Sequence, residues 1–121
     1  MYPSRDLQRG SAELLVLALL RDRPMYGYEI IRELRERSEG YFAMEEGLLY
    51  PALHRLEREE LVRAEWKLVD GRKRRYYAIT ESGLAALSSA TAEWATFSRI
   101  FLGILDPFGG ARYAEAAPDI C

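Results

Sequence analysis

A change in the spacing of apolar residues constrains the fold of this chain more than any other feature. Around residues 62 to 79 the spacing switches to a period of two, which is typical of β-strands. The two alternating segments are Val62–Val69 and Arg74–Ile79, and Asp70 and Gly71, a pair favoured in tight hairpin turns, stand between them. These residues predict a β-hairpin in the second half of the chain.

Two helices are expected before the hairpin. Ser11–Arg21 is apolar nearly all round, so it predicts a buried helix that begins at Ser11 and stops before Pro24. Tyr26–Arg37 has apolar residues at helical spacing and charged residues between them, and Gly40 is expected to end it.

A third helix is expected from about Glu46 to about Glu60. Its buried face is predicted to consist of Leu49, Leu53 and Leu56, which are spaced by four and three residues. Pro51 would cost about 3 kcal/mol inside a helix but little in a first turn. The helix proper is therefore expected to begin only one or two residues before Tyr50.

A long helix is expected after the hairpin. Thr80 and Glu81 favour a helix start, and Pro107 favours its end. The intervening apolar residues are spaced by threes and fours, as in a coiled-coil seam. The predicted dimerisation residues are Leu84, Leu87, Thr91, Trp94, Phe97, Phe101 and Leu105.

Three helices followed by a hairpin predict a mainly α fold with a β-hairpin, the winged helix-turn-helix arrangement, plus a long C-terminal dimerisation helix. We expect a DNA-binding domain over residues 1–80, the dimerisation helix over 81–106, and a flexible tail over 107–121. In such a fold the third helix enters the major groove of DNA, and the hairpin lies along the phosphates or a minor groove.

The charge of the hairpin supports binding to DNA. The whole chain has a net charge of −2, which by itself argues mildly against a nucleic-acid partner. Residues 62–79, however, contain six basic and two acidic residues, a local charge of +4 against −6 for the rest. A run such as Arg72–Arg75 is, taken alone, usually a solvated turn; at the tip of a hairpin behind a helix-turn-helix it favours contact with phosphates.

Other classes of function find little support. One histidine, one cysteine at position 121 and no motif of paired carboxylates leave no catalytic site, metal site or cofactor site to build on. No apolar run approaches the roughly 20 residues that span a bilayer, and the start of the chain does not resemble a signal peptide. A cytoplasmic protein that is not an enzyme and does not contact membranes is expected.

Four blocks of sequence resemble the PadR family of transcriptional regulators. They are LLVLALL at 14–20, YGYEI at 26–30, GLLYPALHRLE at 47–57 and GRKRRYYAIT at 71–80, and the likeness extends over about residues 7–105. The family pattern has Thr or Ser where this chain has Leu48, and Gly where it has Glu60. A left-handed helix cap at Glu60, if it is kept, would cost about 1 kcal/mol without glycine.

The resemblance and the fold together imply that a homodimer binds a pseudo-palindromic operator in double-stranded DNA. Tyr50 is expected at a phosphate, and His54 either at a base edge or simply at the surface. Of Tyr26 and Tyr28, one is expected to pack and the other to reach the phosphates. The full set of candidate DNA-binding residues is Tyr26, Leu48, Tyr50, Pro51, His54, Arg58, Arg72, Lys73 and Arg74.

The single C-terminal helix resembles that of the short subgroup of the family, some members of which bind flat aromatic compounds between paired tryptophans. Trp94 matches that place, so Trp94 and Leu14 are the candidate ligand-binding residues, although a tryptophan on such a seam is more often dimer core. We expect a repressor that a planar aromatic small-molecule effector releases. The alternative is a ligand-sensing or protein-interaction winged-helix module with weak or no DNA binding.

Overall fold

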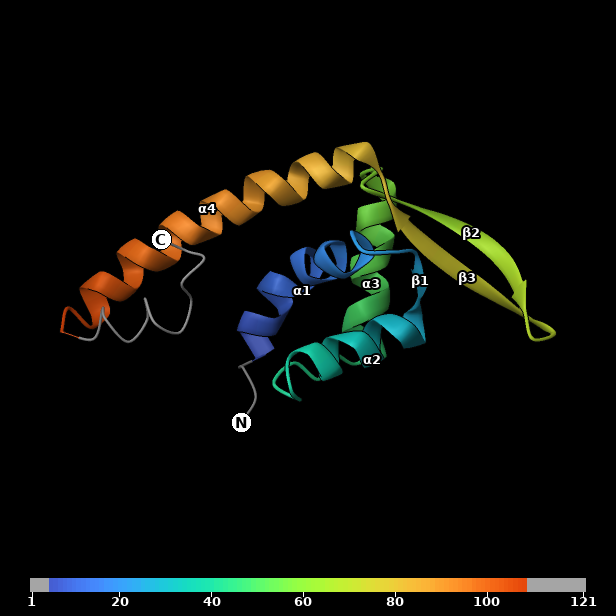
Figure 1. The fold of residues 1–121 in the computed structure, drawn as a ribbon, viewed down its shortest axis with the longest axis horizontal. Coiled ribbons are helices and arrows are strands. Elements are labelled where there is room, and N and C mark those ends of the chain that lie inside the picture. The colour runs from blue at the N-terminus through green and yellow to red at the C-terminus, as the bar shows by residue number, and fades with distance from the viewer. Residues whose placement is uncertain (1–4, 109–121) are drawn as a thin grey trace. The chain divides into compact units, whose positions relative to one another are not determined.

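The computed structural model describes residues 5–108, and their side chains from Ser11 onward. The elements, in chain order, are α1 (Arg5–Leu20), β1 (Met25–Tyr26), α2 (Gly27–Arg37), α3 (Glu46–Arg58), β2 (Val62–Val69), β3 (Arg72–Ile79) and α4 (Glu81–Leu105) (Figure 1). Residues up to Leu87 form one compact unit and residues from Ser88 form another, and α4 contributes to both. The predicted class, a winged helix-turn-helix with a long C-terminal helix, is confirmed.

The hairpin forms around the predicted turn. Asp70 and Gly71 both have positive φ, 51° and 77°, as a two-residue hairpin turn of this kind requires. β3 begins at Arg72, two residues earlier than expected, because Arg72 pairs with Val69 directly across the turn. β2 and β3 project from the helices as the wing of the fold (Figure 1).

The sheet has a third strand that the sequence did not predict. β1 pairs antiparallel with β3, so the strand order is β1-β3-β2. β1 is only two residues long, too short to produce an alternating pattern. It places Tyr26 opposite Tyr76 and so joins the start of α2 to the wing.

α1 starts earlier than predicted, and α3 starts at the expected outer bound, Glu46, rather than one or two residues before Tyr50. α1 begins at Arg5 and continues through Ser11. No proline lies between Pro3 and Pro24, so nothing of that kind interrupts the helix. α3 begins at Glu46, where the Glu45 carbonyl accepts the first helical hydrogen bonds. Pro51 therefore lies inside α3 and costs it one backbone bond, rather than standing in its first turn.

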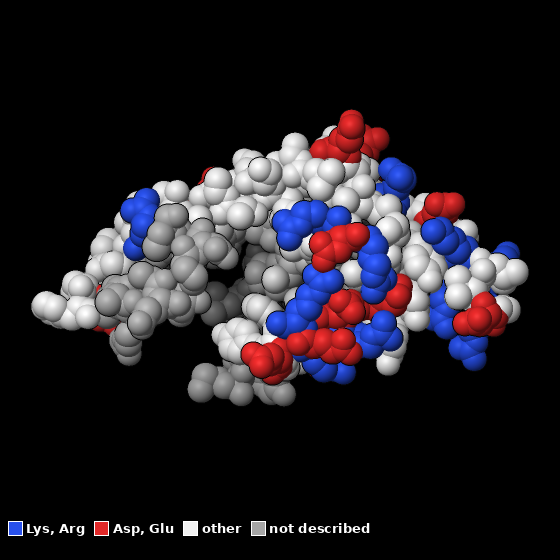
Figure 2. Space-filling model, in the orientation of Figure 1, with Lys and Arg blue, Asp and Glu red and all other residues white. Residues whose placement is uncertain are grey.

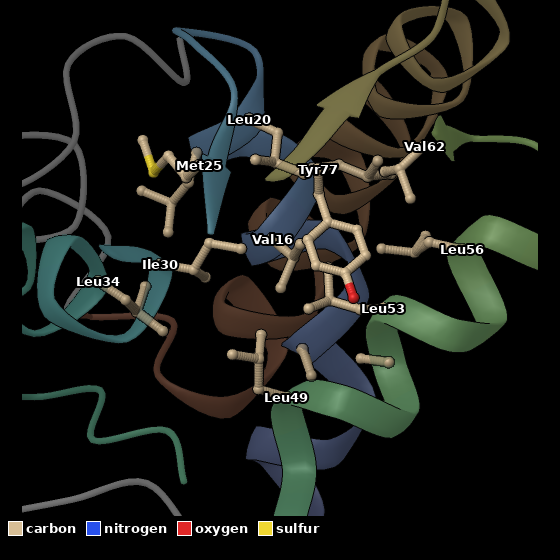
Figure 3. Close-up of a cluster of buried hydrophobic side chains, with 14 of the residues drawn as sticks. Val16, Leu20, Met25, Ile30, Leu34, Leu49, Leu53, Leu56, Val62 and Tyr77 are labelled. Carbon is tan, nitrogen blue, oxygen red and sulfur yellow. The ribbon is translucent and has the colours of Figure 1, made fainter. Parts of the chain in front are cut away.

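The core of the first unit is apolar and lies between α1, α2, α3 and the sheet (Figure 3). The predicted leucines Leu49, Leu53 and Leu56 are all buried there. The largest buried side chain is Tyr77 of β3, whose ring lies against α3 (Figure 3). Burial raises the pKa of the Tyr77 hydroxyl, and the nearby Arg75 partly offsets this.

The end of α3 keeps a left-handed cap although it has no glycine. Glu60 has φ 61°, and the N–H groups of Glu60 and Leu61 donate to the carbonyls of Glu57 and Leu56. The Thr80 hydroxyl donates to the Glu60 carbonyl and accepts from the Gly83 N–H, which caps α4 as expected. One left-handed residue thus lies at the junction of α3, the sheet and α4.

Replacing Glu60 with glycine is expected to raise the free energy of unfolding by about 1 kcal/mol, since glycine adopts positive φ without the steric cost of a Cβ. Urea denaturation at fixed protein concentration measures the change. The neighbouring variant Glu59→Gly is the control, because Glu59 has φ −84° and gains nothing from glycine. Equal effects of the two substitutions would contradict this explanation.

Candidate nucleic-acid interface

The surface of α3 opposite its buried leucines carries most of the predicted contact residues. Pro51, His54 and Arg58 recur at three and four residues along the helix and are exposed. Tyr50 lies one turn before His54 and is 37% exposed. The structure therefore brings these four predicted residues to one accessible side of a single helix.

The side chain of Tyr50 lies across the start of α2. A Cβ added to Gly27 would stand 2.3 Å from the Tyr50 hydroxyl oxygen, so any larger residue at position 27 would require the Tyr50 ring to shift. Tyr26, the residue before Gly27, is the N-cap of α2, and its N–H donates to the Glu29 carboxylate. A residue of α3 and the N-terminus of α2 thus meet at Tyr26 and Gly27.

Leu48 does not share the exposed side of α3. Its side chain is half-buried and packs against the core, and its N–H donates to the Glu45 carbonyl. The structure gives Leu48 a packing position, in contrast to its predicted place among the DNA contacts, because helical geometry turns this position toward the core.

The three predicted basic residues of the wing fall on two faces of the hairpin. By register, Arg72 and Arg74 share one face with Lys67, which lies opposite Arg74. Lys73 lies on the other face, opposite Leu68. Basic side chains line the wing, with acidic ones between them (Figure 2). The sequence run is continuous, but the pleat of the strand divides it.

A row of tyrosine rings with cationic side chains against them joins the wing to α2. The Arg74 guanidinium carbon lies 4.4 Å from the centre of the Tyr26 ring, and Lys67 Nζ lies 5.0 Å from that of Tyr76. Tyr26 contacts Tyr76 edge-on at 5.4 Å and stacks on Tyr28 at 6.5 Å. Cation–π contacts of this kind hold cationic side chains in place.

We call this row the cation–aromatic strip; its members are Arg32, Tyr28, Tyr26, Arg74, Tyr76 and Lys67. Tyr26 and Arg74 were predicted site residues, and the structure brings them together. Tyr26 is half-buried and Tyr28 is 62% exposed, so Tyr26 takes the packing position of the pair. Lys67 and Tyr76 were not predicted as site residues from the sequence. The two-residue turn sets the strand register, and the period of two then places both side chains on the same face as Arg74.

The charges on α2 and on the turn that follows α1 are arranged differently from those of the wing. Arg37 binds Asp22 at 2.6 Å and Glu33 at 3.0 Å, and Arg23 binds Glu29 at 3.2 Å. Asp22 and Glu33 raise the pKa of Arg37. These ion pairs balance charge locally, and Figure 2 shows blue and red side chains intermixed over the helices of the first unit, which leaves the excess positive charge to the wing.

The second unit presents an apolar face along α4. Trp94, Phe97 and Phe101 are each about half-exposed, and their rings follow one another at 5.8 Å and 5.3 Å. Thr91 and Leu105 are also exposed. Of the predicted dimerisation residues, Leu84 is 43% exposed, whereas Leu87 is 5% exposed and belongs to the core of the first unit.

The other candidate ligand residue, Leu14, is half-buried on α1.

Within residues 5–108, no three His, Cys, Asp or Glu side chains are grouped so as to hold a metal ion. No helix in the described part of the chain is both long and apolar enough to cross a membrane. Cys121 and most of the predicted tail, residues 109–121, lie outside the described residues.

Three helices, an exposed third helix and a basic hairpin together define a DNA-binding protein of the winged helix-turn-helix class. The model of the transcriptional regulator PadR-like family matches residues 16–89. The chain belongs to this family, as the resemblance implied, and it is a DNA-binding transcriptional regulator rather than an enzyme.

Known relatives support this assignment. A transcriptional regulator of Mycobacterium tuberculosis is 35% identical over 99 residues, which cover 82% of this chain and 90% of the relative. A solved PadR family regulator from Eggerthella lenta is 33% identical with a TM-score of 0.74, over 83% of this chain and 86% of that one. A solved regulator from Clostridium thermocellum is 27% identical with a TM-score of 0.73, over 85% and 97%.

Proposed function

We propose that this chain is a homodimeric repressor that binds a pseudo-palindromic operator and is released by a small-molecule effector. The observation that carries the proposal is the meeting of three elements at Tyr26 and Gly27. Tyr50 of α3 lies against Gly27, and Arg74 of the wing lies over Tyr26. A helix for the major groove and a cationic wing are thereby held together.

In this proposal every predicted DNA-binding residue except Leu48, which packs against the core, is given a task. His54 and Arg58 contact base edges from the exposed side of α3, and Pro51 lies with them on that side. Tyr50 and the wing residues Arg72, Lys73 and Arg74 bind phosphates, and Tyr26 holds Arg74 in place. Residues 1–80 bind DNA, 81–106 dimerise, and 107–121 form a tail outside both functions.

Selection from a random duplex library, followed by hydroxyl-radical footprinting, tests this function. We expect a selected site with two half-sites about 34 Å apart, one helical turn, because a two-fold dimer presents two copies of α3. Affinity should fall steeply with salt, as it does when several phosphates are contacted. If no sequence is enriched and no duplex is retained, the protein-interaction alternative would take the place of DNA binding.

The aromatic face of α4 supports dimerisation. The double variant Phe97→Glu with Phe101→Glu is expected to raise the dimer dissociation constant at least about tenfold, since it places charges in an apolar contact. Sedimentation velocity over a concentration series measures this constant. Arg99→Glu is the matched control, because residue 99 lies on the opposite side of the helix from 97 and 101; an equal effect of the control would contradict the assignment of the face.

The effector is proposed to be a flat, apolar or cationic aromatic compound. Trp94 supports this, because its ring is 47% exposed and could stack on a ligand from each of two subunits. A Trp66→Phe variant leaves Trp94 as the one tryptophan, and planar compounds should quench its emission. A panel of planar compounds that leaves this emission unchanged would remove the effector from the proposal.

A further inference from the structure

Two large apolar side chains of the wing lie outside both the core and the cation–aromatic strip. Trp66 is 60% exposed and Leu68 is 72% exposed. By register they share the hairpin face that carries the buried Val62 and Tyr77, farther along toward the turn. The apolar side of the hairpin therefore continues past the edge of the core into solvent. Large apolar side chains exposed side by side do not stabilise an isolated wing, so they indicate a contact surface.

Cationic side chains lie directly beside this apolar pair. Arg75 is the cross-strand partner of Trp66, and Lys73 is the cross-strand partner of Leu68. The Arg75 guanidinium carbon lies 5.5 Å from the centre of the Trp66 ring. The complementary surface must therefore offer apolar groups and negative charge side by side.

Arg75 links Trp66 to α3. The Arg75 guanidinium that lies over the Trp66 ring also binds the Glu57 carboxylate of α3 at 3.0 Å. An ordered side chain loses less conformational entropy when it enters a contact. The pairing of Arg75 with Glu57 also means that Arg75 acts mainly as a positioning residue, whereas Lys73 on the same face is exposed.

We propose that Trp66 and Leu68 are the apolar contact of the wing with the minor groove of DNA, while Lys73 binds a bordering phosphate. This inference rests on the proposed function. The deoxyribose edges that wall the minor groove are apolar and lie between two phosphate chains, which matches the pairing of apolar and cationic groups on this face. A second copy of the wing fits less well, because two hairpins that each carry a local charge of +4 repel one another.

Acrylamide quenching of Trp66 tests the contact. The variant Trp94→Phe leaves Trp66 as the one tryptophan, and the probe is a labelled duplex of about 30 base pairs that contains the selected site. Saturation with this duplex is expected to lower the quenching constant at least about threefold, since a ring in a groove is shielded from solvent. Anisotropy of the labelled duplex reports binding independently of Trp66.

The possible outcomes are distinct. If the duplex binds but quenching of Trp66 is unchanged, the inference is overturned and the proposed function stands. If the wild-type protein does not bind the duplex at all, the proposed function fails and the inference fails with it. If Trp66 becomes shielded without DNA as the protein concentration rises, the surface contacts protein, which also overturns the inference.

Base substitution distinguishes the minor groove from phosphates alone. Replacing G·C with inosine·C in the flanks beneath the wing removes the guanine amino group from the minor groove. We expect this change to raise wild-type affinity about twofold or more, and to leave the Trp66→Ala, Leu68→Ala double variant unaffected. Equal responses of the two proteins would overturn a minor-groove contact by these side chains. Glu65→Ala, on the opposite face of the hairpin, is the control and should respond as the wild type does.

Discussion

Removing the three cationic side chains at the tip of the wing, with Arg72, Lys73 and Arg74 all changed to alanine, is expected to weaken operator binding on the order of 100-fold at physiological salt. Each phosphate contact contributes about 0.9 to the magnitude of the negative slope of log affinity against log salt. In the triple variant this magnitude should therefore fall by nearly three for each hairpin that contacts DNA. Titration of a labelled operator duplex at several salt concentrations measures both quantities. The effect on folding should be small, because Arg72 and Lys73 are exposed.

A second triple variant separates local from global charge. Arg21→Ala, Arg35→Ala and Arg99→Ala make the same change in net charge at exposed positions outside the wing and the cation–aromatic strip. This control should lose less than about threefold in affinity, because charges beyond a Debye length of about 8 Å are largely screened. If the wing variant bound as tightly as the wild type at physiological salt, the wing would have no role in binding phosphates.

The largest effect on stability is expected from Gly83→Ala. A Cβ at position 83 would lie 2.2 Å from the Leu61 carbonyl oxygen and 2.7 Å from Ile79 Cγ1. That carbonyl already accepts the Thr80 N–H at 3.0 Å, so it cannot move away without breaking the bond that ties α4 to the end of α3. We expect the free energy of unfolding to fall by about 3 kcal/mol, measured by urea denaturation at fixed protein concentration.

Gly103→Ala is the matched control for this substitution. Gly103 also lies within α4, but a Cβ there would meet no atom within 4 Å. Alanine should therefore stabilise the helix by up to about 1 kcal/mol through its higher helix propensity. Opposite signs at the two glycines would establish that close approach to Leu61, rather than helix propensity, requires glycine at position 83; a similar gain at both would refute it.

Much of the fold could be predicted because its signals are local. The hairpin turn at Asp70 and Gly71 depends on a backbone conformation that few residue pairs adopt, and the helices depend on a spacing that is visible in any short window. The left-handed cap at Glu60 was expected from the resemblance to a family that has glycine there, and the structure keeps that conformation without glycine. Element starts were less well predicted, since α1 and α3 extend through residues that only weakly oppose a helix.

The candidate interface was predicted less completely than the fold. The sequence identified the third helix and the basic hairpin but treated Arg72, Lys73 and Arg74 as one group. Strand pleating divides them between two faces, and the register places Lys67 beside Arg74. The sequence also did not reveal that Leu48, on the same helix, is half-buried and packs against the core.

The amino-acid sequence by itself determined the order of the helices and the hairpin, the local charge of +4 and the apolar row of α4, because each depends on neighbouring residues. Only the tertiary structure decided how these parts combine. It paired Tyr26 with Tyr76 through a strand of two residues, set Tyr50 against Gly27, and linked Arg75 to Glu57 beside Trp66. These contacts join residues that are distant along the chain, and their geometry depends on the packing of the core around Tyr77, which no local pattern encodes.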